Sequence, residues 1–159
     1  MDLGKKRIII TGSDSVITMP LTARLKELGC SHITVPRRSE YDLRSQERVV
    51  RLYEMVRPHI VIHNARYGKK EDATAETGAP LFYDNMIMGL ELLEKARIFG
   101  IEQFIFIGSS RAYPENTVEP AAEDALWNGK PSAEHVAVGI ADRLISLQGE
   151  LYRQYYGSV

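Results

Sequence analysis

A chain of 159 residues with 20 lysine and arginine against 21 aspartate and glutamate side chains has a formal net charge of −1, too small to attract nucleic acid or an anionic membrane. Its single cysteine, Cys30, excludes an internal disulfide and a cysteine-rich zinc site, which fits a reducing cytoplasm. No stretch has the length and apolarity of a secretory leader or a membrane span, so we expect one soluble, cytoplasmic domain over residues 1–159, without nucleic-acid, membrane or metal partners.

The first predicted elements lie in residues 7–18, RIIITGSDSVIT, where β-favouring residues run into a glycine and a turn rich in serine and aspartate. This pattern predicts a strand, a phosphate-type loop and the start of a helix. In a doubly wound α/β domain, the turn after the first strand presents backbone N–H groups to the pyrophosphate of a dinucleotide. Gly12 and Ser15 are therefore candidate cofactor-binding residues.

The same loop also has an interpretation without a ligand. Asp14 would repel a phosphate unless its carboxylate caps the following helix. An ordinary strand-to-helix turn capped by Ser15 or Thr18 explains these residues equally well. Pro20 is tolerated only in the first helical turn, so we expect the helix to start near Thr18 or Met19.

The next segment predicts a second strand and a nucleotide-reading turn. Leucines at helical spacing and then HITVP complete one βαβ unit. Arg37 and Arg38 follow this strand, where arginine favours the 2′-phosphate of NADP over the free hydroxyl of NAD, although a solvated basic turn explains them slightly better. Residues 40–43 predict a short third edge strand, with Asp42 near the adenine pocket.

A helix capped by Ser45 and ended before Pro58 leads to HIVIHNA, which predicts a strand buried on both faces. Ligands bind at the carboxyl ends of such strands, so Asn64 and Ala65 are candidate cofactor-binding residues. His63 is interpreted as a packing histidine rather than a base, because nothing in the sequence positions a partner for it.

Residues 69–78 predict a loop, and residues 80–99 predict a long helix ended by Gly100. Asn85 falls within the apolar pattern of this helix, so its amide needs hydrogen-bond partners and is expected to tie the helix to the neighbouring strand loop. The expected apolar face consists of Phe82, Met86, Gly89, Leu93 and Ala96.

Residues 103–107 predict another buried strand, and the GSSRAYP that follows puts hydroxyl groups at its carboxyl end. Ser109 is the one plausible catalytic hydroxyl there. Residues 115–132 are expected to form a loop on the substrate side, and residues 133–155 a final helix. One face of that helix forms an apolar stripe typical of core packing, made of Val136, Ile140, Leu144, Leu147 and Leu151.

Five segments together resemble the extended short-chain dehydrogenase/reductase family, also called the NAD-dependent epimerase/dehydratases. The likeness runs over nearly the whole chain, and within the family it is strongest to the GDP-L-fucose synthases, which are nucleotide-sugar reductase/epimerases. The most specific matches are RRSEYDL after the second strand, FYDNM at 82–86 and IGSSRAYP at 107–114, with weaker support from EDALWNG at 123–129 and YRQYYG at 152–157.

The resemblance implies a Rossmann-like, doubly wound parallel sheet of about five strands in the order 3-2-1-4-5, truncated before the family's C-terminal substrate domain. It also implies NADP(H) as cofactor and a nucleotide or nucleotide-sugar as ligand. Ser109 matches the catalytic serine, Asn85 the Asn-Met position and Arg38 the arginine near the phosphate of NADP.

The family's catalytic Tyr-x-x-x-Lys falls on Val136 and Ile140, so the sequence predicts that catalysis is lost or strongly reduced. The alternative is a non-catalytic binding or scaffold module that acts through protein-protein contacts, with both residues absorbed into the core. In either case the sheet edge beside residues 103–107 is expected to be open, which predicts a homo-oligomer or a partner chain there.

Overall fold

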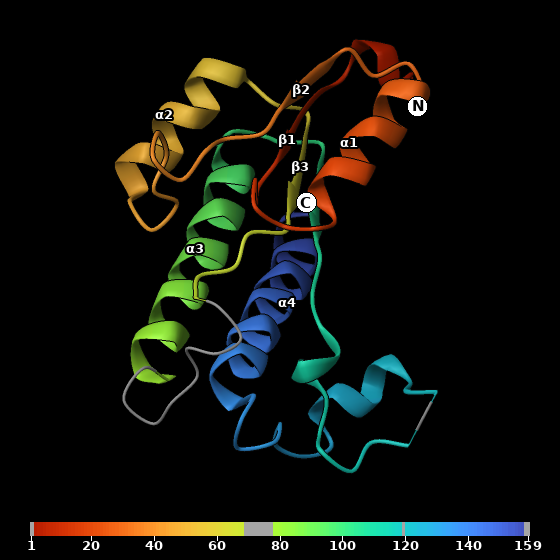
Figure 1. The fold of residues 1–159 in the computed structure, drawn as a ribbon, viewed down its shortest axis with the longest axis vertical. Helices are drawn as coiled ribbons and strands as arrows, with labels where there is room; N and C mark the ends of the chain where they lie inside the picture. Colours follow the sequence, from red (N-terminus) through yellow and green to blue (C-terminus); the bar gives the residue numbers. More distant parts are fainter. Residues whose placement is uncertain (1, 69–77, 119, 158–159) are drawn as a thin grey trace.

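Short runs of β-branched residues build one parallel sheet at the centre of the molecule (Figure 1). The computed structural model describes residues 2–68, 78–118 and 120–157; the loop predicted at 69–78 therefore falls almost wholly outside the described residues. The sheet has four strands in the order β2-β1-β3-β4, and all three neighbouring pairs are parallel. The strands are β1 (Arg7–Ile10), β2 (His32–Thr34), β3 (Ile60–His63) and β4 (Gln103–Phe106).

Helices connect the strands and cover both faces of the sheet (Figure 1). Ile8 and Ile10 of β1 pack in the cluster beneath α1, whereas Ile9 packs in the cluster beneath α2 and α3. This alternation confirms the predicted Rossmann-like, doubly wound α/β fold. The helices are α1 (Thr18–Glu27), α2 (Gln46–Val56), α3 (Gly78–Ile98) and α4 (Val136–Tyr156), with 3-10 turns η1 (Leu3–Lys5), η3 (Ser110–Ala112) and η4 (Glu123–Trp127).

Two helix starts test the capping predictions. Ser45 caps α2 as predicted, because its hydroxyl accepts a hydrogen bond from the N–H of Arg48 at 3.4 Å. Helix α1 begins at Thr18, as Pro20 predicted. The predicted cap of α1 by Ser15 or Thr18 is wrong, because its N-cap position is Ile17 and no side chain caps it.

The third edge strand predicted at residues 40–43 is wrong, because these residues form turns closed by local hydrogen bonds. The carbonyl of Arg37 accepts from the N–H groups of both Glu40, at 3.0 Å, and Tyr41, at 2.9 Å. The described sheet therefore has four strands rather than about five, and the remaining strands keep their predicted order.

The apolar stripe predicted to bury α4 lies partly on its outer side: Ile140 and Leu144 are half-buried, and the other three residues are exposed. Val136 is 40% exposed, Leu147 37% and Leu151 41%. The side chain of Ile145 packs directly over Gly89 where α3 crosses α4, since a Cβ atom on Gly89 would lie 2.1 Å from Cδ1 of Ile145. The expectation that Val136 is absorbed into the core is therefore wrong. The side chains that α4 buries are instead those of Gly139, Ala141, Asp142, Arg143 and Ile145.

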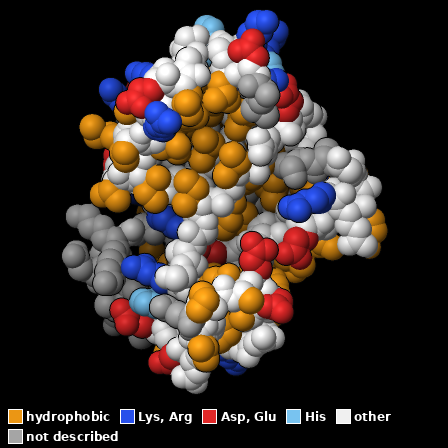
Figure 2. Space-filling model, turned by 90° about the vertical axis from the view of Figure 1, so that its right-hand side faces the viewer, with side chains coloured by type: hydrophobic (Ala, Val, Ile, Leu, Met, Phe, Trp, Pro, Cys, Tyr) orange, Lys and Arg blue, Asp and Glu red, His pale blue; other side chains and the backbone are white. Residues whose placement is uncertain are grey.

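The predicted apolar face of α3 is confirmed in its second half, where Gly89, Leu93 and Ala96 are buried. In the first half Phe82 and Met86 are only half-buried, and Leu81 and Met88 are buried in their place. Strand β4 is less buried than predicted, with Gln103 and Ile105 exposed, because it is the last strand of the described sheet. Figure 2 views the molecule from the side on which α1 lies in Figure 1, and hydrophobic side chains gather in the upper half of that face.

Candidate functional site

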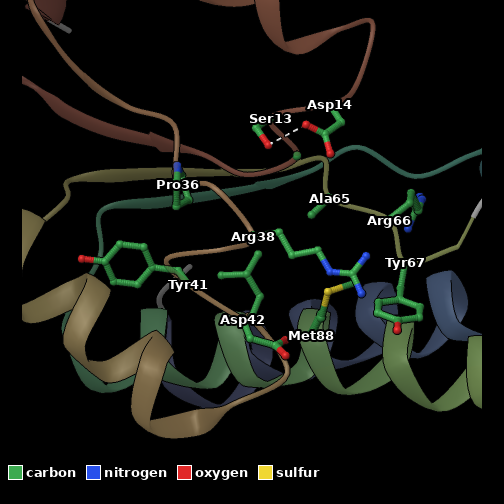
Figure 3. A pocket seen from close by; sticks show the side chains of 12 residues that line it. Ser13, Asp14, Pro36, Arg38, Tyr41, Asp42, Ala65, Arg66, Tyr67 and Met88 are labelled. Carbon is green, nitrogen blue, oxygen red and sulfur yellow. Dashed lines mark hydrogen bonds between the residues drawn. The ribbon is translucent and has the colours of Figure 1, made fainter.

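A cavity of about 100 Å³ opens at the carboxyl ends of β1 and β3, which is where an open α/β sheet binds its ligands. Figure 3 shows the side chains around it. The walls come from the loop after β1, the turn after β2, the connection after β3 and one residue of α3: residues 12–14, Pro36, Arg38, residues 41–43, residues 65–67 and Met88.

The hydroxyl of Thr11 holds the ends of β1 and β3 together beneath this cavity. Its oxygen accepts from the N–H groups of Asn64 and Ala65, both at 3.1 Å, and lies 2.8 Å from Nδ1 of His63. Two accepted bonds leave the hydroxyl proton to be donated to Nδ1, so neutral His63 carries its own proton on Nε2. Sequence reasoning missed Thr11, because a threonine at a strand end is ordinary.

His63 is fully buried and is the packing histidine that was predicted. Burial lowers its pKa to about 3, with a further contribution from the positive charge of Arg66. The ring stacks on Phe106 with 5.6 Å between centroids, and its Nε2 has no hydrogen-bond partner among the described residues. A ring with so low a pKa is a weak base, so His63 is poorly suited to general base catalysis near neutral pH.

Gly12 is needed where the loop after β1 crosses the end of β3. Its φ is +91°, and a Cβ atom there would lie 2.8 Å from the carbonyl oxygen of Asn64. The amide of Asn64 donates to the hydroxyl of Thr18 at 3.3 Å, and Asn64 is not among the residues that line the cavity. Ala65 and Gly12 do line the cavity, so these two of the predicted cofactor residues meet there.

The rest of this loop offers little to a phosphate. The N–H of Ser15 donates to the carbonyl of Gly12 at 3.0 Å, and its hydroxyl accepts from Ile17 at 3.3 Å. Ser15 does not line the cavity, but Asp14 does, and its carboxylate accepts from Ser13 at 3.0 Å, the bond dashed in Figure 3. An anion in the cavity would therefore meet a carboxylate.

Arg38 reaches across the cavity from the turn after β2 (Figure 3). Its guanidinium carbon lies 4.2 Å from the centroid of the Tyr67 ring, and no ion pair between described residues involves it. Arg44 lies 4.6 Å from the same ring centroid. Tyr67 thus holds two guanidinium groups, of which Arg38 is available to an incoming anion.

Asp42 also lines the cavity, but its carboxylate is bound to Arg44. The two side chains lie 2.7 Å apart, and Asp84 contributes a second carboxylate to Arg44 at 3.2 Å. The hydrogen bond from Arg44 lowers the pKa of Asp42, and the same bond raises the pKa of Arg44. This pair stays ionised, so Asp42 presents a fixed negative charge at the predicted adenine pocket.

Asn85 ties α3 to the connection after β3, as predicted. Its oxygen accepts from the N–H of Tyr67 at 2.9 Å, and its NH2 group donates to the carbonyls of Tyr67 at 3.1 Å and Leu81 at 2.8 Å. Asn85 does not line the cavity. It positions the aromatic ring that carries Arg38, and its direct contact with a cofactor stays a prediction.

Ser109 lies beyond the cavity, at the end of β4. Its hydroxyl accepts from the N–H of Arg111 at 3.3 Å, and its own N–H donates to Asp142 at 3.1 Å. Its neighbours Ser110 and Arg111, with His135, line a separate open hollow of about 510 Å³ at the start of α4. The structure therefore does not bring Ser109 together with Gly12 and Arg38, and its catalytic role stays a prediction.

An ion pair that sequence reasoning missed separates the cavity from Ser109. Arg66 makes two bonds to the carboxylate of Asp142, at 2.6 and 2.9 Å, and a third to the carbonyl of Ile107 at 3.0 Å. Burial raises the pKa of Asp142, and the nearby Arg66 opposes that rise. The one signal for it in the sequence is a carboxylate within the apolar pattern of α4.

No proton donor or acceptor stands where the family resemblance places its catalytic pair. Val136 is exposed at the start of α4, and Ile140 is half-buried one turn further on. Among residues 2–68, 78–118 and 120–157, no three His, Cys, Asp or Glu side chains are grouped to hold a metal ion. No helix within the same ranges is long and apolar enough to cross a membrane.

Comparison with known proteins begins with a family profile, described as the NAD dependent epimerase/dehydratase family, that matches residues 8–156. A GDP-L-fucose synthase from Sinorhizobium fredii is 30% identical over 158 residues, which cover 98% of this chain and 49% of that protein. A GDP-L-fucose synthase from Dictyostelium discoideum is 23% identical, covering 96% of this chain and 48% of that protein. The chain spans about half the length of these curated relatives.

Solved structures with the same fold include a GDP-mannoheptose C4 reductase from Campylobacter jejuni with NADP bound. Its TM-score is 0.87 at 23% identity, and the match covers 98% of this chain and 49% of that one. A GDP-L-fucose synthetase from Naegleria fowleri bound to NADP has a TM-score of 0.84 at 22% identity, covering 95% of this chain and 45% of that one. At these identities the likeness establishes the fold alone.

Proposed function

Because the chain belongs to the NAD dependent epimerase/dehydratase family, we propose that it is an NADP(H)-binding relative of the nucleotide-sugar epimerase/reductases whose own catalysis is lost or strongly reduced. The observation that carries this proposal is the cavity beside Arg38. It offers one arginine without a carboxylate partner among the described residues, at the turn where this fold reads the 2′-position of the adenosine ribose.

The residues around the cavity fit the adenosine end of such a cofactor. Arg38 supplies a charge-assisted hydrogen bond to a 2′-phosphate. Gly12 and Ala65 line the cavity without large side chains. Tyr41 and Leu43 supply apolar walls. When bound, NADPH would supply a hydride to a carbonyl carbon; the chain's own residues would bind and orient the adenosine end.

The proposed loss of catalysis depends on the proton that must accompany a hydride. Val136 and Ile140 have no ionisable group, and burial keeps His63 neutral and unable to take up a proton near neutral pH. Ser109 has a hydroxyl, but the carboxylate next to it, Asp142, is already held by two hydrogen bonds from Arg66 and one from the N–H of Ser109. General acid/base catalysis contributes about two to four powers of ten in rate. We therefore expect this chain to turn over a 4-keto GDP-sugar at least about a hundredfold more slowly than an enzyme that has the Tyr-x-x-x-Lys pair.

Calorimetric titration with NADPH, with NADH alongside, tests the proposal. We expect saturable binding that favours NADPH. Arg38→Ala should weaken NADPH binding by about tenfold to a hundredfold, since one charge-assisted hydrogen bond contributes about 1.5–3 kcal/mol, and should leave NADH binding unchanged. Arg37→Ala is the matched control, because Arg37 is exposed and does not line the cavity.

No saturation by NADPH at millimolar concentration would reject the nucleotide site. A second measurement follows the absorbance of reduced nicotinamide in the presence of a 4-keto GDP-sugar. Steady oxidation at the rate of an ordinary reductase would contradict the proposed loss of catalysis and would call for a proton donor at another position, since Val136 and Ile140 have none.

A non-catalytic scaffold that acts through protein contacts is the second candidate function. The observation that favours it is the outer side of α4, where Leu147 and Leu151 are exposed together with Tyr155. Exposed apolar side chains gathered on one helix mark an interaction surface more often than a free one. A second copy of the chain is the proposed occupant, with the exposed edge of β4 as a further contact for it.

A further inference from the structure

The crevice along the carboxyl ends of the strands is divided into two unequal parts. The cavity of about 100 Å³ lies over β2, β1 and β3, on the side of Arg38. Its walls include none of the described residues of β4 or α4. Pockets that enclose a whole small-molecule ligand usually hold about 300–1,000 Å³, so this cavity has room for one part of a dinucleotide only.

The Arg66–Asp142 pair bounds this cavity on the side of β4 and Ser109. Arg66 connects the wall of the cavity to the end of β4. Its guanidinium binds Asp142 and the carbonyl of Ile107, which lies just after β4. The Asp142 side chain is only 2% exposed. Opening this wall would separate a bidentate ion pair and leave a buried carboxylate without its partner, which folded proteins resist.

The middle of the crevice is also unsuited to a pyrophosphate. In this fold the pyrophosphate sits on free N–H groups of the loop after the first strand. Here the N–H of Ser15 is bound to the carbonyl of Gly12, the N–H of Ile17 is bound to the hydroxyl of Ser15, and Asp14 brings a carboxylate to the lining of the cavity. The arrangement supplies one good anion contact, at Arg38, and one repulsive group.

We propose that this crevice is a receptor for a 2′-phosphorylated adenine nucleotide, and that the nicotinamide half of NADP makes no contact with the chain. The inference rests on the proposed NADP(H) site and narrows it to one half of the cofactor. Arg38 recognises the ribose phosphate, and the Arg66–Asp142 wall excludes the second nucleotide from the end of β4. A nucleotide held in this way does not enter redox chemistry on this chain.

The experiment compares NADP+ with adenosine 2′,5′-bisphosphate, using calorimetry for affinity and saturation-transfer NMR for contact. We expect the two dissociation constants to agree within about threefold, because the nicotinamide adds no contact. Saturation should reach the adenine protons of NADP+ and not its nicotinamide protons. NADP+ binding tenfold or more tightly, with saturated nicotinamide protons, would overturn the inference and leave the proposed function standing. Binding of neither ligand would reject both.

A double variant, Arg66→Ala with Asp142→Ala, tests the wall itself. Removing both charges avoids an unpaired buried carboxylate and opens the end of β4. The variant should bind NADP+ more tightly than the bisphosphate and bring the nicotinamide protons into contact. Arg24→Ala with Glu27→Ala removes an exposed ion pair on α1 and should leave the affinity ratio unchanged. If the double variant does not fold, the NMR contacts of the parent chain still decide the matter.

Discussion

At the scale of single residues, one hydroxyl orients the histidine beneath the site, and burial keeps that histidine neutral. Thr11 accepts two backbone N–H groups and donates to His63, whose fully buried ring has a lowered pKa. Between about pH 6.5 and its folded pKa of about 3, unfolded His63 binds a proton that the folded chain excludes. Acid therefore favours unfolding in this range, by up to about 1.4 kcal/mol per pH unit.

His63→Asn tests this linkage, because asparagine keeps a polar atom toward Thr11 and does not titrate. Urea unfolding of the parent should lose about 2 kcal/mol between about pH 6.5 and pH 5, a range above most carboxylate titrations. The variant should lose much less over the same range, whatever its stability at pH 8. Equal losses in the two proteins would show that His63 takes up a proton in the folded state.

A comparison of two glycines distinguishes the cost of backbone strain from the cost of a steric clash. Gly12 and Gly29 have nearly the same φ, +91° and +88°, but a Cβ atom would meet backbone atoms of Asn64 and Ala65 only at Gly12. Gly29→Ala should cost about 1–2 kcal/mol of unfolding free energy from strain alone. Gly12→Ala should cost clearly more, and urea unfolding of both variants measures the difference. Equal costs would mean that the two loops at the site move apart easily.

At the scale of elements, the positions of the four strands and of the first two helices were predicted from the sequence, because they depend on local patterns, whereas the strand predicted at residues 40–43 does not form. An apolar run such as Ile60–Ile62 predicts a buried strand whichever neighbours it meets. Helix α4 was different. Periodicity showed that Val136, Leu147 and Leu151 share a face, but the direction of that face depends on the fit of Ile145 against Gly89 in another helix.

The candidate site also contains residues that the sequence predicts and residues that only the structure reveals. Gly12, Arg38 and Ala65 were predictable, because the fold brings the ends of β1, β2 and β3 to one crevice and each residue lies in the connection that follows its strand. The Arg66–Asp142 pair joins residues 76 positions apart. Neither partner carries a local signal for the other, so their contact, and the wall that it makes, needed the three-dimensional structure.

At the scale of the whole molecule, the chain matches about half the length of its curated relatives and leaves two surfaces open. Strand β4 ends the described sheet, and the outer face of α4 is apolar. Figure 2 shows a further gathering of hydrophobic side chains on the side of α1. Because unpaired strand edges and apolar helix faces favour association, the assembly state is the most informative property of the whole chain.

Leu147→Lys combined with Leu151→Lys tests whether α4 mediates self-association. Both side chains are more than a third exposed, so the variant should keep the parent's unfolding free energy within about 0.5 kcal/mol. Light scattering at micromolar concentration should give the parent the mass of a dimer and the variant that of a monomer. Leu28→Lys, on exposed α1-side surface, is the control and should leave the parent's mass unchanged. A parent that is monomeric at every concentration would reject self-association through α4, and only the nucleotide site would then remain as a proposed function for the chain.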